Sequence, residues 1–323
     1  MAINKQKLNE VAKKLLAAKS VALFCHQNPD EDALGSCGAL KLALEKLGKR
    51  TAIFCEDKVP KRLEFLEVNL CDDKNELGKY ETFCLVDGCA AYRTGSFETY
   101  FDNAKIRLCL DHHQIEEYTF DCAYQDPTCA SASDIVTELI PLLGVQIDGT
   151  MATLLYAGIT ADTGRFLFPS PTASDSLNHA STLLTLGADM DKVNFNSFRK
   201  KRKDYPLFLK MFLKNTKPYF NGKIFLTTIK QKEYEKYKEV WDENDCPKTL
   251  DWIDGCEITV VAIGKKKGYF HLNFRSVGDI NVGNIARIFG GGGHKNASGG
   301  EYFGSAKEMQ KAILDECSKH LSK

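Results

Sequence analysis

Acidic and imidazole side chains follow an apolar segment near the start of the chain. The segment VALFC, residues 21–25, leads into His26, and Asp30 and Asp32 follow in the polar stretch QNPDED. Proline disfavours a helical conformation at the residue before it, so both carboxylates are expected on a loop where they can converge with His26. Three such groups repel one another unless a cation lies between them, although aspartates before a helix are also common caps. For this motif alone, both interpretations stay open.

Further acidic and imidazole groups lie at the ends of other apolar segments. They are Asp87 at the end of FCLVD, Asp111, His112 and His113 from the end of RLCLD onward, and Asp162 after LLYAGITA. Each carboxylate alone is more typical of a turn or a helix end. Consecutive histidines directly after a buried strand are harder to explain by packing. Mixed imidazole and carboxylate groups, in a chain without a CxxC pair, suit manganese or a similar divalent ion better than structural zinc.

These groups can meet only if the strands before them end at one edge of a sheet. Apolar runs at residues 21–25, 51–55, 83–87 and 107–111 predict strands, and residues 33–47, 133–143, 150–161 and 172–186 predict helices. This alternation indicates an α/β, Rossmann-like domain with a parallel sheet covered on both faces. In such sheets the chemistry collects at the carboxyl ends of the strands.

The second half of the chain predicts a smaller α+β domain. A polar, basic helical stretch containing KKRKDYP connects the halves, and KIFLTTI, EITVVAIG and YFHLNFRS predict strands. Residues 282–289 and 306–321 predict helices. We therefore expect a metal-binding catalytic domain over residues 1–189, a helical linker over 190–217 and a substrate-binding domain over 218–323.

Composition limits the class of protein. The chain has 323 residues, 43% of them hydrophobic, which is enough for two packed cores. Its charged N-terminal segment lacks the apolar block of a signal peptide, and no run is long and apolar enough to span a bilayer. The 12 cysteines form no CxxC pair and several lie in apolar runs, which favours reduced thiols. We expect a cytoplasmic protein without membrane association.

The net charge of the chain is zero, but its basic and acidic residues are distributed unevenly along the sequence. Residues 1–190 carry 18 Lys and Arg against 27 Asp and Glu, and residues 191–323 carry 25 against 16. One interpretation of this asymmetry is that the acidic half holds metal and the basic half attracts an anion. An accidental sorting of surface charge is the other, and charge alone does not decide between them.

The ordered motifs carry a family resemblance. HQNPDED, the strand end at Asp87, DHH at residues 111–113 and GITADTGRF resemble the four motifs of the DHH phosphoesterases. GGGGHKNASGG, residues 290–300, resembles the signature of the DHH-associated domain that follows in one branch of that family. The chain's size is similar to the NrnA type, which acts on very short RNA and on 3′-phosphoadenosine 5′-phosphate. Glu31 stands where many relatives have glycine, and we expect it not to be a ligand.

The resemblance implies a centre of two Mn²⁺ ions, with Mg²⁺ as the alternative, in which Asp87 bridges both ions. Such a pair can activate water and clamp the attacking and leaving oxygens of a displacement. The first ion is expected on His26, Asp30 and Asp87, and the second on Asp32, Asp87, His112 and Asp162.

The remaining roles are also implied by the resemblance. Asp111 would orient His112, and His113 would lie beside the scissile phosphate as a charge stabiliser or acid. His179, His271 and His320 have no motif around them and are interpreted as structural or solvated. Substrate phosphate is expected on Arg275, Gly291, Gly292, Gly293 and His294.

The expected reaction is phosphoester hydrolysis. Substrates would be oligoribonucleotides a few residues long, releasing nucleoside 5′-monophosphates, and 3′-phosphoadenosine 5′-phosphate. The alternatives are a phosphodiesterase for linear or cyclic dinucleotides, an inorganic pyrophosphatase, and a non-catalytic nucleic-acid-binding module, which would lack some of the ligands. A homodimer is left open.

Overall fold

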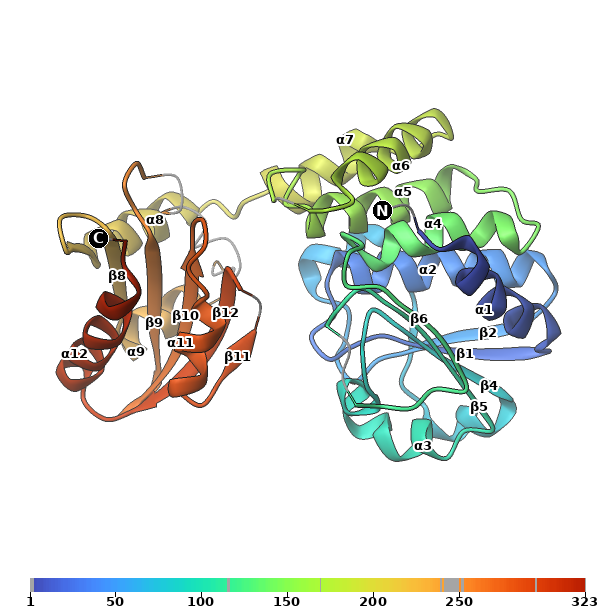
Figure 1. Cartoon of the computed structure of the whole chain (residues 1–323), viewed down its shortest axis with the longest axis horizontal. Coiled ribbons are helices and arrows are strands. Elements are labelled where there is room, and N and C mark those ends of the chain that lie inside the picture. Colours follow the sequence, from blue (N-terminus) through green and yellow to red (C-terminus); the bar gives the residue numbers. More distant parts are fainter. Residues whose placement is uncertain are drawn as a thin grey trace. The chain divides into compact units, whose positions relative to one another are not determined.

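The computed structural model describes residues 3–114, 117–168, 170–238, 240, 250, 253–293 and 295–322. The chain divides into two compact units, Met1–Lys200 and Lys201–Lys323, which are shown in Figure 1. This division falls inside the expected linker, while the domain boundaries at 189 and 218 stay a prediction. No helix among the described residues is long and apolar enough to cross a membrane. The described cysteines are all free thiols.

A six-stranded sheet forms the centre of the first unit. Its strands are β1 (Ser20–Phe24), β2 (Arg50–Phe54), β3 (Leu70–Cys71), β4 (Thr82–Val86), β5 (Ile106–Asp111) and β6 (Cys122–Gln125). They lie in the order β3-β2-β1-β4-β5-β6, and all neighbours are parallel. Every residue of β4 is buried, as is typical of a parallel strand covered on both faces. The predicted parallel-sheet domain is confirmed.

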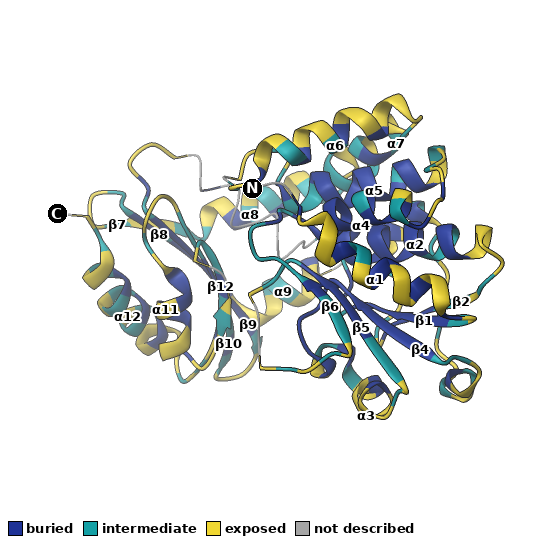
Figure 2. Cartoon of the chain, turned by 45° about the vertical axis from the view of Figure 1, so that its right-hand side comes forward, coloured by how far each residue is buried: buried dark blue, intermediate teal, exposed yellow. Residues whose placement is uncertain are grey.

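Helices cover both faces of this sheet (Figures 1 and 2). One face carries α1 (Lys5–Ala17), α2 (Glu31–Lys46) and α4 (Ala132–Leu142). The helix α5 (Gly149–Asp162) packs on α2 and α4, and α6 (Ala173–Thr185) packs on α5. The other face carries the 3₁₀ helix η3 (Ala91–Phe97) and α3 (Glu98–Asp102), which pack with the rings of Phe24 and Phe54 in a second apolar cluster. The shorter elements are η1 (Lys61–Leu66), η2 (Lys74–Lys79), α7 (Met190–Val193) and the π-helix η4 (Asn194–Arg199).

Glycines allow α2 to pack closely against its neighbours. A Cβ atom at Gly35 would lie 2.3 Å from the carbonyl oxygen of Leu154 in α5. A Cβ atom at Gly158 would lie 2.1 Å from Ser133 Oγ and 2.5 Å from Asp32 Oδ1. Because no side chain fits in these spaces, the first turn of α2, with Asp32, lies directly against α4 and α5.

The second unit is built on a mixed six-stranded sheet. Its strands are β7 (Thr216–Tyr219), β8 (Ile224–Ile229), β9 (Ile258–Lys266), β10 (Tyr269–Ser276), β11 (Gly292–Gly293) and β12 (Ala297–Phe303). They lie in the order β11-β12-β10-β9-β8-β7, with only β8 and β9 parallel among the described pairs. The helices are α8 (Tyr205–Lys214), α9 (Gln231–Tyr237), α11 (Val282–Ile288), α12 (Ala306–Cys317) and η5 (Ser318–His320). The predicted α+β domain is therefore confirmed.

Several elements carried no clear signal in the sequence. The strands β3, β6, β7, β11 and β12 and the helix α9 were not predicted, because they are short, polar or rich in glycine. No strand was predicted in the glycine-rich segment, residues 290–300. In the structure, Gly292 and Gly293 instead pair with Gly299 and Ser298 across two antiparallel strands.

Candidate metal centre

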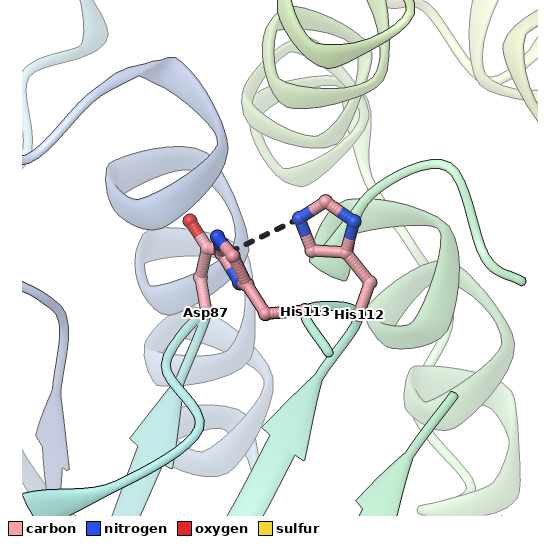
Figure 3. Close-up of side chains that lie close together, drawn as sticks. All are labelled: Asp87, His112 and His113. Atoms are coloured by element: carbon pink, nitrogen blue, oxygen red, sulfur yellow. Dashed lines mark ion pairs between the residues drawn. The ribbon is translucent and has the colours of Figure 1, made fainter. Parts of the chain in front are cut away.

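Three adjacent strands of the first sheet end in candidate ligands. His26 follows β1, Asp87 follows β4, and His112 follows β5, and these strands are neighbours in the order β1-β4-β5. Figure 3 shows Asp87, His112 and His113 rising together from the strand ends. The amide of Asp87 donates to the carbonyl of Leu110 at 2.9 Å, which extends the β4–β5 pairing to the ligand itself.

The first group of candidate ligands joins β1, the start of α2 and β4. His26 Nε2 lies 3.9 Å from Asp30 Oδ1 and 3.4 Å from Asp87 Oδ2. One ligand atom from each of these residues lies within 4.8 Å of the other two, close enough to share a metal ion. The structure thus brings together His26, Asp30 and Asp87, the group that the family resemblance implied.

The second group gathers around His112. Its Nε2 lies 3.1 Å from Asp162 Oδ2, 3.3 Å from Asp87 Oδ1 and 3.9 Å from Asp32 Oδ2. Asp32, His112 and Asp162 also place one ligand atom each within 4.8 Å of one another. The structure therefore brings all of the expected metal ligands to the same edge of the sheet.

Asp87 lies between the two groups. Its Oδ2 faces His26 and its Oδ1 faces His112, so one carboxylate contacts both imidazoles. Asp87 Oδ1 and His112 Nε2 are buried, and neither has a hydrogen-bond partner among the described residues. Buried polar atoms normally have partners. A divalent cation between these two atoms would supply the missing interaction, so the donor set fits a metal ion.

The carboxylates of the site differ strongly in their pKa. Burial would raise the pKa of Asp87, but its contacts with His112 and His26 hold that pKa well below the usual range. Burial and the charges of Asp162 and Asp87 raise the pKa of Asp32 well above its ordinary value. Burial likewise raises the pKa of Asp162 to about 6. Without a cation, this many carboxylates cannot all ionise in so small a space.

The imidazoles compensate part of this negative charge. Burial would lower the pKa of His26 and of His112, but the carboxylates around them raise both well above the ordinary value. Protonated histidines therefore stabilise the metal-free site. A metal ion would replace those protons, since a ligating histidine must be neutral.

Backbone amides orient the two aspartates of the first motif. Asp30 Oδ1 accepts hydrogen bonds from the amides of Asp32 and Ala33 at 3.0 Å each, so Asp30 is both the N-cap of α2 and a candidate ligand. Asp32 accepts from the amides of Ala132 at 2.6 Å and Ser133 at 2.9 Å, at the start of α4. The capping and metal interpretations of this motif are thus compatible.

Glu31 pairs with an arginine and is not among the candidate ligands. Its Oε1 lies 2.5 Å from Nη1 of Arg62, and it belongs to neither group of candidate ligands. This arrangement agrees with a Glu31 that does not bind metal.

Asp111 contacts a different histidine from the one expected. We expected it to orient His112, but Asp111 Oδ1 instead lies 2.9 Å from His113 Nδ1. Side chains two positions apart along an extended chain point to the same side, whereas adjacent ones do not. His113 Nδ1 also lies 3.5 Å from Asp87 Oδ1, which places His113 at the edge of the metal groups. Its role beside a phosphate stays a prediction.

The expected phosphate-binding residues lie in the second unit. Arg275 is half-buried on β10, where its Nη1 donates to the carbonyl of Phe274 at 3.0 Å. A Cβ atom at Gly291 would lie 1.9 Å from the carbonyl oxygen of Gly299, and one at Gly293 would lie 2.7 Å from that of Ala297. These glycines are thus required by strand packing, whereas the space beside Gly292 is open. His294 lies outside the described residues, and the phosphate-binding roles stay predictions.

The amides that hold Asp32 were not identified from the sequence. Ala132 and Ser133 follow the N-cap Ser131 in the segment SASD, which is a signal for the start of a helix. That signal predicts where α4 begins. It does not say which side chain its first amides bind.

Comparisons with known proteins agree with the two-unit fold. Residues 20–159 match the family model described as "DHH family, N-terminal domain". Residues 223–322 match the model of the DHHA1 domain. The "Bifunctional oligoribonuclease and PAP phosphatase NrnA" of Thermus thermophilus is 29% identical over 297 residues, covering 91% of this chain and 88% of the relative. The protein of the same name from Bacillus subtilis is 27% identical over 311 residues, covering 95% and 96%.

Solved structures show the same fold. An exopolyphosphatase-related protein from Bacteroides fragilis superposes with a TM-score of 0.87 at 22% identity, over 98% of this chain and 97% of the other. RecJ from Thermus thermophilus, solved in complex with Mn²⁺, superposes with a TM-score of 0.58 at 14% identity, over 98% of this chain and 55% of RecJ.

Proposed function

Because this chain belongs to the DHH family and joins its N-terminal domain to a DHHA1 domain, we propose that it is a metal-dependent phosphoesterase for short oligoribonucleotides and 3′-phosphoadenosine 5′-phosphate. The observation that carries this proposal is the position of Asp87, whose two carboxylate oxygens face two separate ligand groups. The substrates are proposed from the relatives named as oligoribonuclease and PAP phosphatase.

We propose Mn²⁺ as the ion in both groups. Imidazole and carboxylate ligands together suit Mn²⁺ better than Mg²⁺, which prefers oxygen ligands and bound water. When bound, two such ions activate water and neutralise charge on the phosphoryl oxygens. His26, Asp30 and Asp87 would hold one ion, and Asp32, Asp87, His112 and Asp162 the other.

His113 is the proposed proton donor to the leaving oxygen. Asp111 holds its Nδ1 at 2.9 Å, which fixes the orientation of the ring. The proton that His113 donates would therefore come from Nε2. Asp111 acts through His113 by holding the imidazole in this orientation.

The second unit is proposed to bind substrate phosphate. The guanidinium of Arg275 matches the geometry of phosphate oxygens, and the basic balance of residues 191–323, 25 Lys and Arg against 16 Asp and Glu, attracts anions. Gly292 and His294 would complete the phosphate contacts. We further propose a cytoplasmic location, because the described cysteines form no disulfide.

A substrate panel tests this function. The purified protein is incubated with Mn²⁺ or with EDTA and with labelled pApA, an RNA pentamer, long RNA, cyclic dinucleotides, inorganic pyrophosphate and 3′-phosphoadenosine 5′-phosphate. We expect Mn²⁺-dependent release of 5′-monophosphates from the short RNAs and of inorganic phosphate from 3′-phosphoadenosine 5′-phosphate. Preferred turnover of cyclic dinucleotides or pyrophosphate would reassign the substrate. Binding of RNA without turnover of any substrate would contradict an enzymatic function.

A further inference from the structure

The first turn of α4 holds the carboxylate of Asp32. The amides of Ala132 and Ser133 donate to its two oxygens at 2.6 and 2.9 Å, and Asp32 is completely buried. Two amides from successive residues fix both the position and the rotation of a carboxylate. The positive end of the helix dipole also favours the ionised form that binds a metal. The position of Asp32 therefore depends on how firmly the first turn of α4 is held.

Asp134 holds that turn from the other side. Its amide donates to Oγ of the N-cap Ser131 at 3.0 Å, and its own Oδ2 accepts from Ser131 Oγ at 3.0 Å. Ser176, on α6, donates to the same Oδ2 at 2.8 Å. Asp134 is only 3% exposed, and both serines are completely buried.

His179, on α6, is a further partner of Asp134. Its Nδ1 lies 2.7 Å from Asp134 Oδ1, and its Nε2 lies 3.1 Å from Oε1 of Glu138, one turn further along α4. Oε2 of Glu138 is in turn 2.9 Å from Nζ of Lys5 on α1. The imidazole therefore ties α6 to two positions on α4, and only one of them, Asp134, lies in the first turn.

We infer that His179, acting through Asp134, is a positioning residue for the metal ligand Asp32. The inference rests on the proposed metal site and goes beyond it, because His179 touches neither a ligand nor a substrate. Its interaction with Asp134 holds Ser131 and the first turn of α4. The amides of that turn then hold Asp32 at the orientation that a metal ion requires. Residues that orient metal ligands in this indirect way commonly change metal affinity about 10–100-fold when they are removed.

Two isosteric substitutions separate the two hydrogen bonds of His179, one to Asp134 and one to Glu138. In His179→Asn, the side-chain amide lies near the place of Nδ1 and can still donate to Asp134, but it cannot reach Glu138. In His179→Gln, the longer amide lies near the place of Nε2 and donates to Glu138, but not to Asp134. Each variant loses one of the two hydrogen bonds of the ring. If His179 had a purely structural role, the two substitutions would therefore change the melting temperature and the Mn²⁺ affinity by similar amounts.

The measurements are Mn²⁺ binding by calorimetry and electron paramagnetic resonance, and the melting temperature in EDTA. We expect His179→Gln to bind its second Mn²⁺ about tenfold or more weakly than the wild type, and His179→Asn to bind it close to wild-type affinity. His320→Gln serves as the control, because it removes a carboxylate-paired histidine of the second unit, 3.3 Å from Glu316. That control should not change Mn²⁺ binding.

The outcomes distinguish this inference from the proposed function. If the wild type binds two Mn²⁺ and both His179 variants bind them equally well, the positioning role is wrong and the metal site stands. Equal losses of melting temperature in both variants, with unchanged Mn²⁺ affinity, would likewise show that His179 is only structural. If the wild type binds no Mn²⁺, the proposed function fails, and the inference fails with it.

Discussion

At the scale of single residues, Asp87 combines a contact with two histidines and an unusual backbone conformation. Its carboxylate contacts His26 and His112 on opposite sides, and its φ of 62° lies in the left-handed region. Few residues other than glycine adopt this conformation, and aspartate and asparagine tolerate it best. Such backbone strain is typical of functional sites. The position therefore favours aspartate both for its charge and for its backbone.

The first prediction compares two substitutions of Asp87. Asp87→Asn keeps the shape and the left-handed backbone but removes the charge, and we expect both Mn²⁺ ions to bind much more weakly. Without the ions, the transition state loses several kcal/mol of charge stabilisation. We therefore expect kcat/KM to fall on the order of a thousandfold or more. Asp87→Ala should be equally inactive and less stable by about 1 kcal/mol, because alanine tolerates this backbone poorly. Turnover assays, circular dichroism and urea unfolding measure these effects.

Glu31→Gln provides the control for this comparison, because Glu31 lies between two candidate ligands but pairs with Arg62. It should keep Mn²⁺ stoichiometry. A folded Asp87→Asn protein with near-normal turnover on every substrate would disprove the two-metal assignment.

At the scale of secondary-structure elements, the contact between α4 and α6 depends on a titrating group. Burial would lower the pKa of His179, but Asp134 and Glu138 raise it above the ordinary value of 6.5, and Lys5 partly neutralises Glu138. Since the folded-state pKa is higher than the unfolded one, folding is favoured by protonation of His179. This contribution is complete below the unfolded pKa and is lost as the pH rises through the folded pKa.

The second prediction follows from this sign. The free energy of unfolding of the metal-free wild type should exceed that of His179→Asn by more at about pH 6 than at about pH 8.5, because asparagine does not titrate. Urea unfolding in EDTA at both pH values measures the difference. A difference that is constant or grows with pH would contradict a raised pKa of His179.

The third prediction concerns the packing of α2 against α5. A Cβ atom at Gly35 would lie 2.3 Å from the carbonyl oxygen of Leu154, so Gly35→Ala forces the helices apart. We expect a loss of about 1–3 kcal/mol in the free energy of unfolding, despite the higher helix propensity of alanine. The control is Gly78→Ala, where no atom lies within 4 Å of the added Cβ. That control should change stability by no more than about 0.5 kcal/mol. Equal stability of the two variants would contradict the close contact.

At the scale of the whole molecule, the proposed function assigns separate tasks to the two units. All of the candidate metal ligands lie in the first unit, and Arg275 lies in the second. The acidic balance of residues 1–190, 18 Lys and Arg against 27 Asp and Glu, suits cations, and the basic remainder suits phosphate. Metal binding and substrate binding should therefore be separable by mutation.

The fourth prediction separates these tasks. Arg275→Ala and His294→Ala should each keep wild-type Mn²⁺ binding while kcat/KM falls. A charged hydrogen bond to phosphate contributes about 1.5–3 kcal/mol, so we expect a loss of about tenfold to a hundredfold. Calorimetry and steady-state kinetics on pApA measure the two properties. Loss of bound Mn²⁺ in either variant would place that residue in the metal site instead.

The fifth prediction is the length of the substrate. An acidic first unit does not attract a long polyanion, and proteins that bind extended single strands use long basic grooves lined with aromatic side chains. No stripe of interleaved basic and aromatic residues occurs in the sequence. We expect kcat/KM to peak at about two to five nucleotides, a length taken from the family resemblance, and to fall on longer RNA. A series of end-labelled oligoribonucleotides at fixed salt measures this. Equal or rising efficiency on much longer chains would favour a processive exonuclease.

The sequence by itself predicted the parallel sheet and the candidate ligands at its carboxyl edge. Apolar runs such as FCLVD and RLCLD carry a local signal for buried strands, and Asp87 and His112 follow them directly. Because parallel strands that are joined by helices end at the same edge, residues distant in sequence could be expected to converge there. Local patterns were sufficient because each ligand lies next to the strand or helix that positions it.

Only the tertiary structure decided which groups orient these ligands. Asp32 is held by the amides of Ala132 and Ser133, Asp111 turns to His113, and His179 reaches Asp134 on a different helix. Every residue except proline has a backbone amide, so an amide that binds a distant carboxylate leaves no mark in the sequence. The short strand β11 was also missed, since its glycines are explained only by the backbone that packs against them. Contacts of this kind depend on how helices and strands pack, which local patterns do not encode.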